Sequence, residues 1–197
     1  MAFKGDPVRV LVVPGLHDSG PAHWQTWLAA HFRHSVRVEQ DDWGRADLVA
    51  WAGRIAETLD RHPGSRWVAV AHSFGCLALA HCLAERQKQG VEAALLVAPA
   101  DPEKFAVLPL LSPSALPVPS VLLASENDPW MTLDSARAWS RAWGTQFINL
   151  GQVGHINTES GFGPLPQAKT LVELMIQRVE RGRRLERAHP LELIFAI

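Results

Sequence analysis

The sequence predicts an α/β fold class: a three-layer α/β/α sandwich whose core is a doubly wound, mostly parallel sheet of about six strands. Apolar runs of strand length alternate along the chain with stretches of helical periodicity, which is the order of βαβ units. The apolar runs are continuous, as in parallel strands that are buried on both faces. The chain has 197 residues and no internal repeat or break in composition, so one domain is expected.

The first half of the chain begins with a β-branched run, VRVLVV, that ends at Pro14-Gly15. Trp24, Trp27, Leu28 and His31 then recur at the spacing of one helix face. A second helix has Asp47 as a suitable N-cap. The predicted elements are a strand at 8–13, a helix at 21–32, a strand at 35–39, a helix at 47–60 and a strand at 67–71.

The second half continues the alternation and has one irregular segment. Six prolines within residues 99–119 predict a loop, because proline interrupts helices. Either Thr132 or Asp134 can cap the helix that follows. The predicted elements are a helix at 74–89, strands at 93–98 and 120–124, a helix from 132 or 134 to 143, a strand at 146–150 and a helix at 165–181 that stops at Gly182.

These elements predict a single domain over residues 1–182 and a separate tail over 183–197. The tail begins basic and ends in LELIFAI, and an added strand, a packing arm and an interface element all remain open for it. The oligomeric state is open as well.

Composition narrows the class of function. The formal net charge is −1, which gives no basic field for nucleic acid. No apolar run approaches the length of a membrane span. The two cysteines, Cys76 and Cys82, fall within one predicted helix and form no CxxC pair, so a reducing, cytoplasmic setting is expected. The histidines lack metal-binding spacing, and we expect neither a metal nor an organic cofactor.

A serine lies at the turn between the strand WVAVA and the next helix. The segment Ala71-His72-Ser73-Phe74-Gly75 fits the G-x-S-x-G nucleophile elbow, with alanine in place of the first glycine. Small residues on both sides let strand and helix pack closely around the serine. The motif therefore predicts Ser73 as a nucleophile, whereas the alternative is that Ser73 only caps its helix.

A serine nucleophile needs a base, and the base needs an acid that orients it. Asp128 follows the strand SVLLA, and His155 follows the strand QFINL, each by a few residues. The order Ser73, Asp128, His155 is that of α/β-hydrolases. Because the carboxyl ends of parallel strands share one edge of a sheet, we predict that the three side chains meet there. Glu126 is the nearest rival for the acid.

Acyl transfer also needs backbone N–H groups that hold the developing oxyanion. We predict the N–H of Phe74, directly after the nucleophile, and the N–H of Leu16, in the loop after the first strand. Gly15 is expected to permit a tight turn there. Four further residues are candidates to line the pocket: His17, His72, Trp130 and Asn157.

Four spaced segments, PGLHDSGPAHWQTWL, AHSFGC, SENDPW and GHINTESGFGPLP, resemble the small serine hydrolase family that includes retinoblastoma-binding protein 9 and the bacterial YdeN-type proteins. The resemblance runs from about Val8 to Leu174. It implies a compact α/β-hydrolase fold without a large cap and a triad of Ser73, Asp128 and His155. The L-x-C-x-E motif that goes with retinoblastoma binding does not occur in the chain, so that partner is not carried over.

The expected function is hydrolysis of a small to medium ester, thioester or activated amide through an acyl-serine, with a small-molecule acyl compound as substrate. Two alternatives stay open. One is a non-catalytic or regulatory protein-binding module on the same scaffold, because a fold does not fix a function. The other is a different reaction of the same triad, such as acyl transfer.

Overall fold

The computed structural model describes residues 7–86 and 90–187. Six strands form its sheet: β1 (Arg9–Val13), β2 (Ser35–Arg37), β3 (Trp67–His72), β4 (Val91–Val97), β5 (Ser120–Ala124) and β6 (Gln146–Asn149). Their order across the sheet is β2-β1-β3-β4-β5-β6, and every neighbouring pair is parallel. The chain thus starts inside the sheet and winds outward in both directions, which confirms the predicted doubly wound topology.

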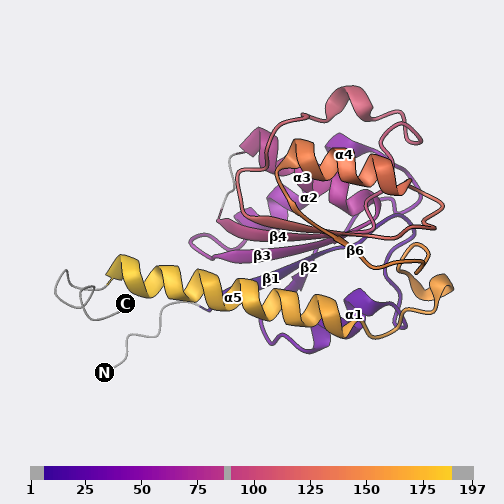
Figure 1. Cartoon of the computed structure of the whole chain (residues 1–197). Helices are drawn as coiled ribbons and strands as arrows, with labels where there is room; N and C mark the ends of the chain where they lie inside the picture. Colours follow the sequence, from indigo (N-terminus) through magenta and orange to yellow (C-terminus); the bar gives the residue numbers. More distant parts are fainter. Residues whose placement is uncertain (1–6, 87–89, 188–197) are drawn as a thin grey trace.

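Helices cover both faces of this sheet. They are α1 (Trp24–Ala30), α2 (Leu48–Asp60), α3 (Phe74–Arg86), α4 (Leu133–Trp143) and α5 (Pro166–Arg187), with the 3₁₀ turns η1 (Leu108–Leu110) and η2 (Thr158–Ser160). Figure 1 shows α2, α3 and α4 on one face and α1 and α5 on the other. The three-layer sandwich is therefore confirmed. The proline-rich segment 99–119 contains only the single turn η1, so no large cap stands over the sheet.

The core consists of two apolar layers, one on each face of the sheet. Alternate strand residues point to opposite faces. In β1, Leu11 packs among the residues of α2, α3 and α4, whereas Val12 packs with those of α1 and α5. Both side chains are fully buried. Since both layers are apolar, the strands read as continuous hydrophobic runs, which is why the sequence predicted a parallel sheet.

The structure corrects the predicted start of α1 and the predicted end of α5, and it decides between the two predicted caps of α4. The helix α1 begins at Trp24, three residues after Pro21, because His23 is its N-cap. The cap of α4 is Thr132, whose side chain accepts a hydrogen bond from the Ser135 N–H. The predicted end of the last helix at Gly182 is wrong, since α5 continues to Arg187.

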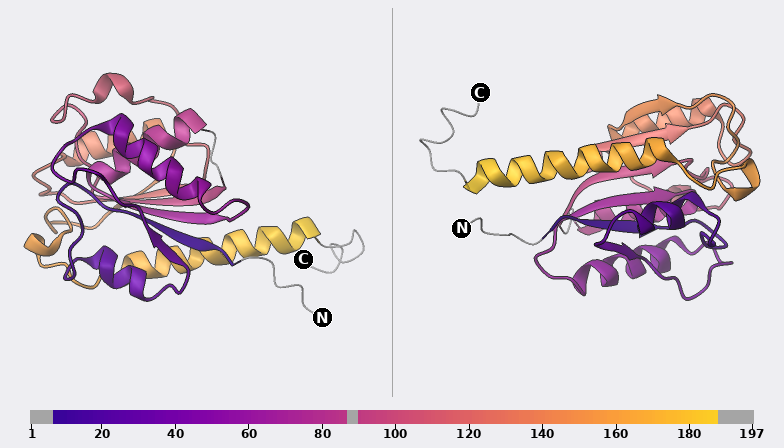
Figure 2. Two further views of the ribbon diagram at one scale, coloured as in Figure 1. Left: turned by 180° about the vertical axis from the view of Figure 1, so that it is seen from behind. Right: turned by 90° about the horizontal axis from the view of Figure 1, so that it is seen from below.

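The reason for the longer α5 lies in the residues around Gly182. Glycine ends a helix when it adopts a left-handed backbone, but Gly182 is not among the glycines with positive φ. Arginines, leucine and glutamate on both sides favour the helix enough to carry it through. Figure 2 shows that α5 extends well past the sheet. Of the predicted tail, residues 188–197 lie outside the described residues.

Two further observations concern the cysteines and the apolar character of the helices. Cys76 and Cys82 are buried and form no disulfide. Within residues 7–86 and 90–187, no helix combines the length and the apolar character that crossing a membrane requires.

Candidate active site

Ser73 lies at the tip of a strained turn between β3 and α3. Its φ of 53° is in the left-handed region, which is uncommon for a residue with a Cβ. The Ser73 N–H donates to the Val97 carbonyl of β4 at 3.1 Å, which fixes the turn against the sheet. Strain held in this way by the surrounding fold is typical of functional positions.

Two glycines make the turn possible by leaving space around it. A Cβ on Gly75 would lie 2.3 Å from the Pro14 carbonyl oxygen, and a Cβ on Gly15 would lie 2.8 Å from the Ser73 Cβ. Gly15 has no positive φ. Its role is therefore to let the loop after β1 approach the serine. The left-handed residues of this loop are His17 and Asp18.

The structure brings Ser73, His155 and Asp128 together in one hydrogen-bonded chain. His155 Nε2 lies 2.9 Å from the Ser73 Oγ, and His155 Nδ1 lies 2.9 Å from each oxygen of Asp128. The side chains of His155 and Asp128 are 7% and 3% exposed. The Asp128 carboxylate also accepts from the Trp130 N–H at 2.8 Å. An imidazole held in this way presents Nε2 to the serine as a proton acceptor.

Glu126, the rival acid, points elsewhere. Its Oε1 accepts a hydrogen bond from the Asn149 side chain at 2.9 Å, and its side chain is exposed. Asn127, between the two acids, accepts from the Gly154 N–H at 2.7 Å. Residues 126 and 127 thus join the loop after β5 to the loop after β6, and Asp128 is left facing the histidine.

The backbone around His155 is held from three directions. The His155 N–H donates to the Ser160 Oγ at 3.0 Å, and the Trp24 indole N–H donates to the Ile156 carbonyl at 2.8 Å. His72, next to the nucleophile in sequence, lies with its Nε2 at 3.0 Å from the His155 carbonyl oxygen. A carbonyl only accepts, so the His72 Nε2 carries a proton. His72 therefore links the two catalytic residues: it precedes Ser73 in the chain, and its side chain holds the backbone of His155.

His72 is uncharged in this arrangement. Burial, together with the neighbouring His155 and His23, lowers the pKa of His72 well below its usual value. The ring centroids of His72 and His155 are 4.9 Å apart. Because two positive charges this close would repel each other, a neutral His72 leaves the catalytic histidine without a cation beside it on this side.

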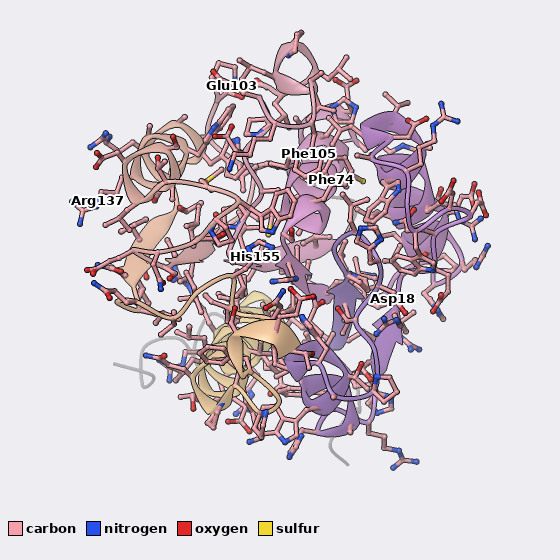
Figure 3. The ribbon with its side chains drawn as sticks, turned by 90° about the vertical axis from the view of Figure 1, so that its right-hand side faces the viewer. Asp18, Phe74, Glu103, Phe105, Arg137 and His155 are labelled. Carbon is pink, nitrogen blue, oxygen red and sulfur yellow. The ribbon has the colours of Figure 1, made fainter. Side chains whose placement is uncertain are left out.

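A cavity of about 350 Å³ opens over the serine. Its aromatic wall is formed by Phe105 and Trp130, whose rings are stacked with centroids 5.9 Å apart. Figure 3 looks at this end of the molecule, with His155 near the centre, Phe105 above it and Asp18 to its right. The cavity is lined by Leu16, His17, Asp18, Gly20, His23, His72, Ser73, Phe105, Trp130, His155, Asn157, Thr158 and Glu159.

All four residues that the sequence suggested for the pocket are in this lining. Gly20 and His23 are among the lining residues that it did not suggest. His23 precedes α1 as its N-cap, but a helix predicted from Pro21 concealed that position. The signal that could have revealed it is a side chain with an acceptor atom directly before the first periodic residue.

The two N–H groups predicted to hold an oxyanion come from two different segments of the chain. Phe74 is the first residue of α3. In the loop after β1, the His17 N–H donates to the Trp43 carbonyl at 2.9 Å, whereas the Leu16 N–H has no acceptor among the described residues. Leu16 lines the cavity. In the described part of the chain, no group of three or more metal-ligating side chains is placed to hold a metal ion.

A parallel sheet whose central strand leads into a strained serine turn, with an acid and a histidine on the next loops, defines the α/β-hydrolase fold. Comparison with known proteins agrees and identifies the family. The model of the serine hydrolase family matches residues 10–174. The chain belongs to this family, as its four motifs predicted.

Solved structures with the same fold include close and distant relatives. A putative YdeN-like hydrolase from Pectobacterium atrosepticum is 35% identical, with a TM-score of 0.82 over 87% of this chain and 91% of the other. The ydeN gene product of Bacillus subtilis is 16% identical, with a TM-score of 0.72 over 86% and 99%. An enol-lactonase from Burkholderia xenovorans is 16% identical, with a TM-score of 0.64 over 89% and 93%. No curated protein sequence matched the chain.

Proposed function

We propose that this serine hydrolase cleaves small to medium esters, thioesters or activated amides through an acyl-serine intermediate. The observation that carries the proposal is the chain of hydrogen bonds from Ser73 Oγ through His155 to the buried Asp128 carboxylate. A serine hydroxyl is a poor nucleophile until an adjacent base takes its proton, and this geometry supplies the base and its orienting acid.

In the first half of the reaction, Ser73 Oγ attacks the carbonyl carbon of the substrate while His155 Nε2 takes the hydroxyl proton. The carbonyl electrons move onto oxygen, and the N–H groups of Leu16 and Phe74 hold the negative charge. When the tetrahedral intermediate collapses, its electrons re-form the carbonyl and break the bond to the leaving group. The leaving group takes the proton from His155, and the acyl group stays on Ser73.

In the second half, water replaces the leaving group. His155 takes a proton from water, the hydroxide attacks the acyl carbon, and Ser73 leaves with the proton that returns from His155. Asp128 keeps its negative charge throughout and stabilises the imidazolium that forms twice. The cavity of about 350 Å³ and its aromatic wall favour a compact acyl compound over a polymer.

The test is intact-mass analysis after treatment with a fluorophosphonate, which phosphonylates an activated serine with loss of fluoride. Wild type is expected to gain one phosphonyl group, and Ser73→Ala none. His155→Ala is expected to react far more slowly, because its serine lacks a base. A folded wild type that stays unlabelled would favour the non-catalytic binding role. If added alcohols are converted to new esters in place of the free acid, the reaction is acyl transfer.

A further inference from the structure

His23 holds the start of α1 with one edge of its ring. Its Nδ1 accepts a hydrogen bond from the Gln25 N–H at 3.1 Å, which is the N-cap interaction of that helix. A ring nitrogen that accepts is unprotonated, so a neutral imidazole bound in this way carries its proton on Nε2. The helix thus fixes the tautomer of His23 and leaves a donor on the opposite edge of the ring.

The ring is uncharged under ordinary conditions. Burial, the Arg37 guanidinium and His155 lower the pKa of His23 to about 4, although Asp18 acts in the opposite direction. Arg37 is itself paired with Asp18 at the cavity rim. His23 is therefore a neutral hydrogen-bond donor, and not a second base or a cation, at the pH where a Ser–His pair works.

The donor edge of the ring faces the cavity and has no acceptor in the described part of the chain. His23 lines the cavity together with Ser73 and His155. Its ring stands edge-on to His72, with centroids 4.9 Å apart, and His72 in turn contacts His155. Among the described residues, no side chain or carbonyl accepts from the Nε2 of His23. His23 is buried as a residue, but its Nε2 is not among the fully enclosed side-chain atoms that lack a hydrogen-bond partner, so this donor is open to the cavity, where water or a ligand can accept from it.

We propose that His23 contacts the substrate and donates its Nε2–H to an oxygen other than that of the scissile carbonyl. This inference rests on the proposed function and narrows its substrate class. The preferred compounds are small esters with an additional acceptor oxygen, such as an ether, hydroxyl or keto oxygen, close to the scissile bond. The oxygen of the scissile carbonyl has its own donors, the N–H groups of Leu16 and Phe74. His23 therefore binds a different oxygen of the substrate.

The test compares pairs of substrates that differ only by oxygen in place of a methylene group. p-Nitrophenyl methoxyacetate against p-nitrophenyl butyrate places the oxygen in the acyl part. 2-Methoxyethyl acetate against butyl acetate places it in the alcohol part. The readout is the ratio of kcat/KM within each pair, because damage to packing affects both members and cancels. Alkaline hydrolysis rates correct for intrinsic reactivity.

Two variants separate the two edges of the ring. In His23→Asn the side-chain oxygen can replace Nδ1 as the cap, since asparagine is a favourable N-cap, but the Nε2 donor is lost. In His23→Gln the amide nitrogen reaches toward the position of Nε2, but the cap is lost. We expect His23→Asn to lower the ratio about 3- to 10-fold in one of the pairs, as for loss of a neutral hydrogen bond. His23→Gln should keep more of the ratio but lower Tm.

A purely structural His23 gives the opposite pattern: His23→Asn leaves both ratios unchanged, and only the loss of the cap in His23→Gln has an effect. That result would overturn the proposal. Fluorophosphonate labelling of wild type and both variants is measured first. Absence of labelling in wild type contradicts the proposed hydrolase, whereas labelling with unchanged ratios contradicts only the role of His23.

Discussion

Gly75 shows how little space the serine turn leaves for the chain beside it. A Cβ at this position would lie 2.3 Å from the Pro14 oxygen and 2.8 Å from the Val13 oxygen. Both are backbone atoms at the end of β1, so a clash cannot be relieved by rotation of a side chain. The loop after β1 and the start of α3 therefore fit together only through a residue without a side chain.

The first prediction follows from this contact. Gly75→Ala should lower the free energy of unfolding by about 1–3 kcal/mol, the usual cost of overpacking a rigid site, as measured by urea denaturation. Gly53→Ala is the matched control, because Gly53 is in α2 and a Cβ there meets nothing within 4 Å. The control should stabilise by about 0.5–1 kcal/mol. Equal effects at both sites would contradict the close approach.

Asp128 and Glu126 allow a test of the acid that orients the base. Both follow β5, but Asp128 bonds His155 Nδ1, whereas Glu126 bonds Asn149. Asp128→Asn should lower kcat for an activated ester by about 10³- to 10⁴-fold, because the amide favours the wrong tautomer of the histidine. Glu126→Gln should change kcat by less than about twofold, as expected for an exposed side chain that bonds Asn149 and not the histidine. A larger effect at Glu126 would show that the acid is misassigned.

At the scale of elements, the strand order accounts for most of what the sequence could predict. Ser73, Asp128 and His155 follow β3, β5 and β6, and parallel strands direct all three loops to one edge of the sheet. The meeting of these three side chains could therefore be predicted from only two observations: the alternation of strands and helices, and the order of the three residues along the chain. The contribution of His23 could not be seen in the same way, because it depends on the residue at which α1 begins.

The last helix was predicted too short because glycine is an ambiguous signal. Gly144 does end α4 with a left-handed backbone, and Gly182 in a similar sequence position does not end α5. The difference is the residue context: strong helix formers follow Gly182, whereas Thr145 and a strand follow Gly144. Local propensity decides between these outcomes, and the glycine alone does not.

The third prediction tests this account of α5. Because Gly182 is inside the helix and a Cβ there meets nothing within 4 Å, Gly182→Ala should raise stability by about 0.5–1 kcal/mol and increase the helical circular dichroism slightly. Gly144→Ala is the counterpart: φ is 65° and the Cβ would lie 3.3 Å from the Ala115 Cβ, so it should destabilise. If Gly182→Ala also destabilised, the helix would end at Gly182 as the sequence first suggested.

For the whole molecule, two of the buried histidines, His23 and His72, make the folded state sensitive to acid. The folded-state pKa of His23 is lowered from 6.5 to about 4, chiefly by burial, and that of His72 is lowered in the same direction. The unfolded chain therefore binds protons to these rings more readily than the folded chain does. Stability must then fall as the pH drops below about 6.5, and for His23 the loss ends near pH 4.

The fourth prediction is how much of this acid-dependent loss of stability is due to His23. A difference of about 2.5 pKa units corresponds to about 3 kcal/mol at the low end of the range. Comparison of wild type with His23→Asn removes the contribution of the carboxylates, which titrate in both proteins. Urea denaturation from pH 7 to pH 4.5 should show the variant gaining about 2–3 kcal/mol relative to wild type as the pH falls. Parallel curves would mean that His23 has the same pKa in the folded and the unfolded chain, and the lowered pKa of the folded state would then be wrong.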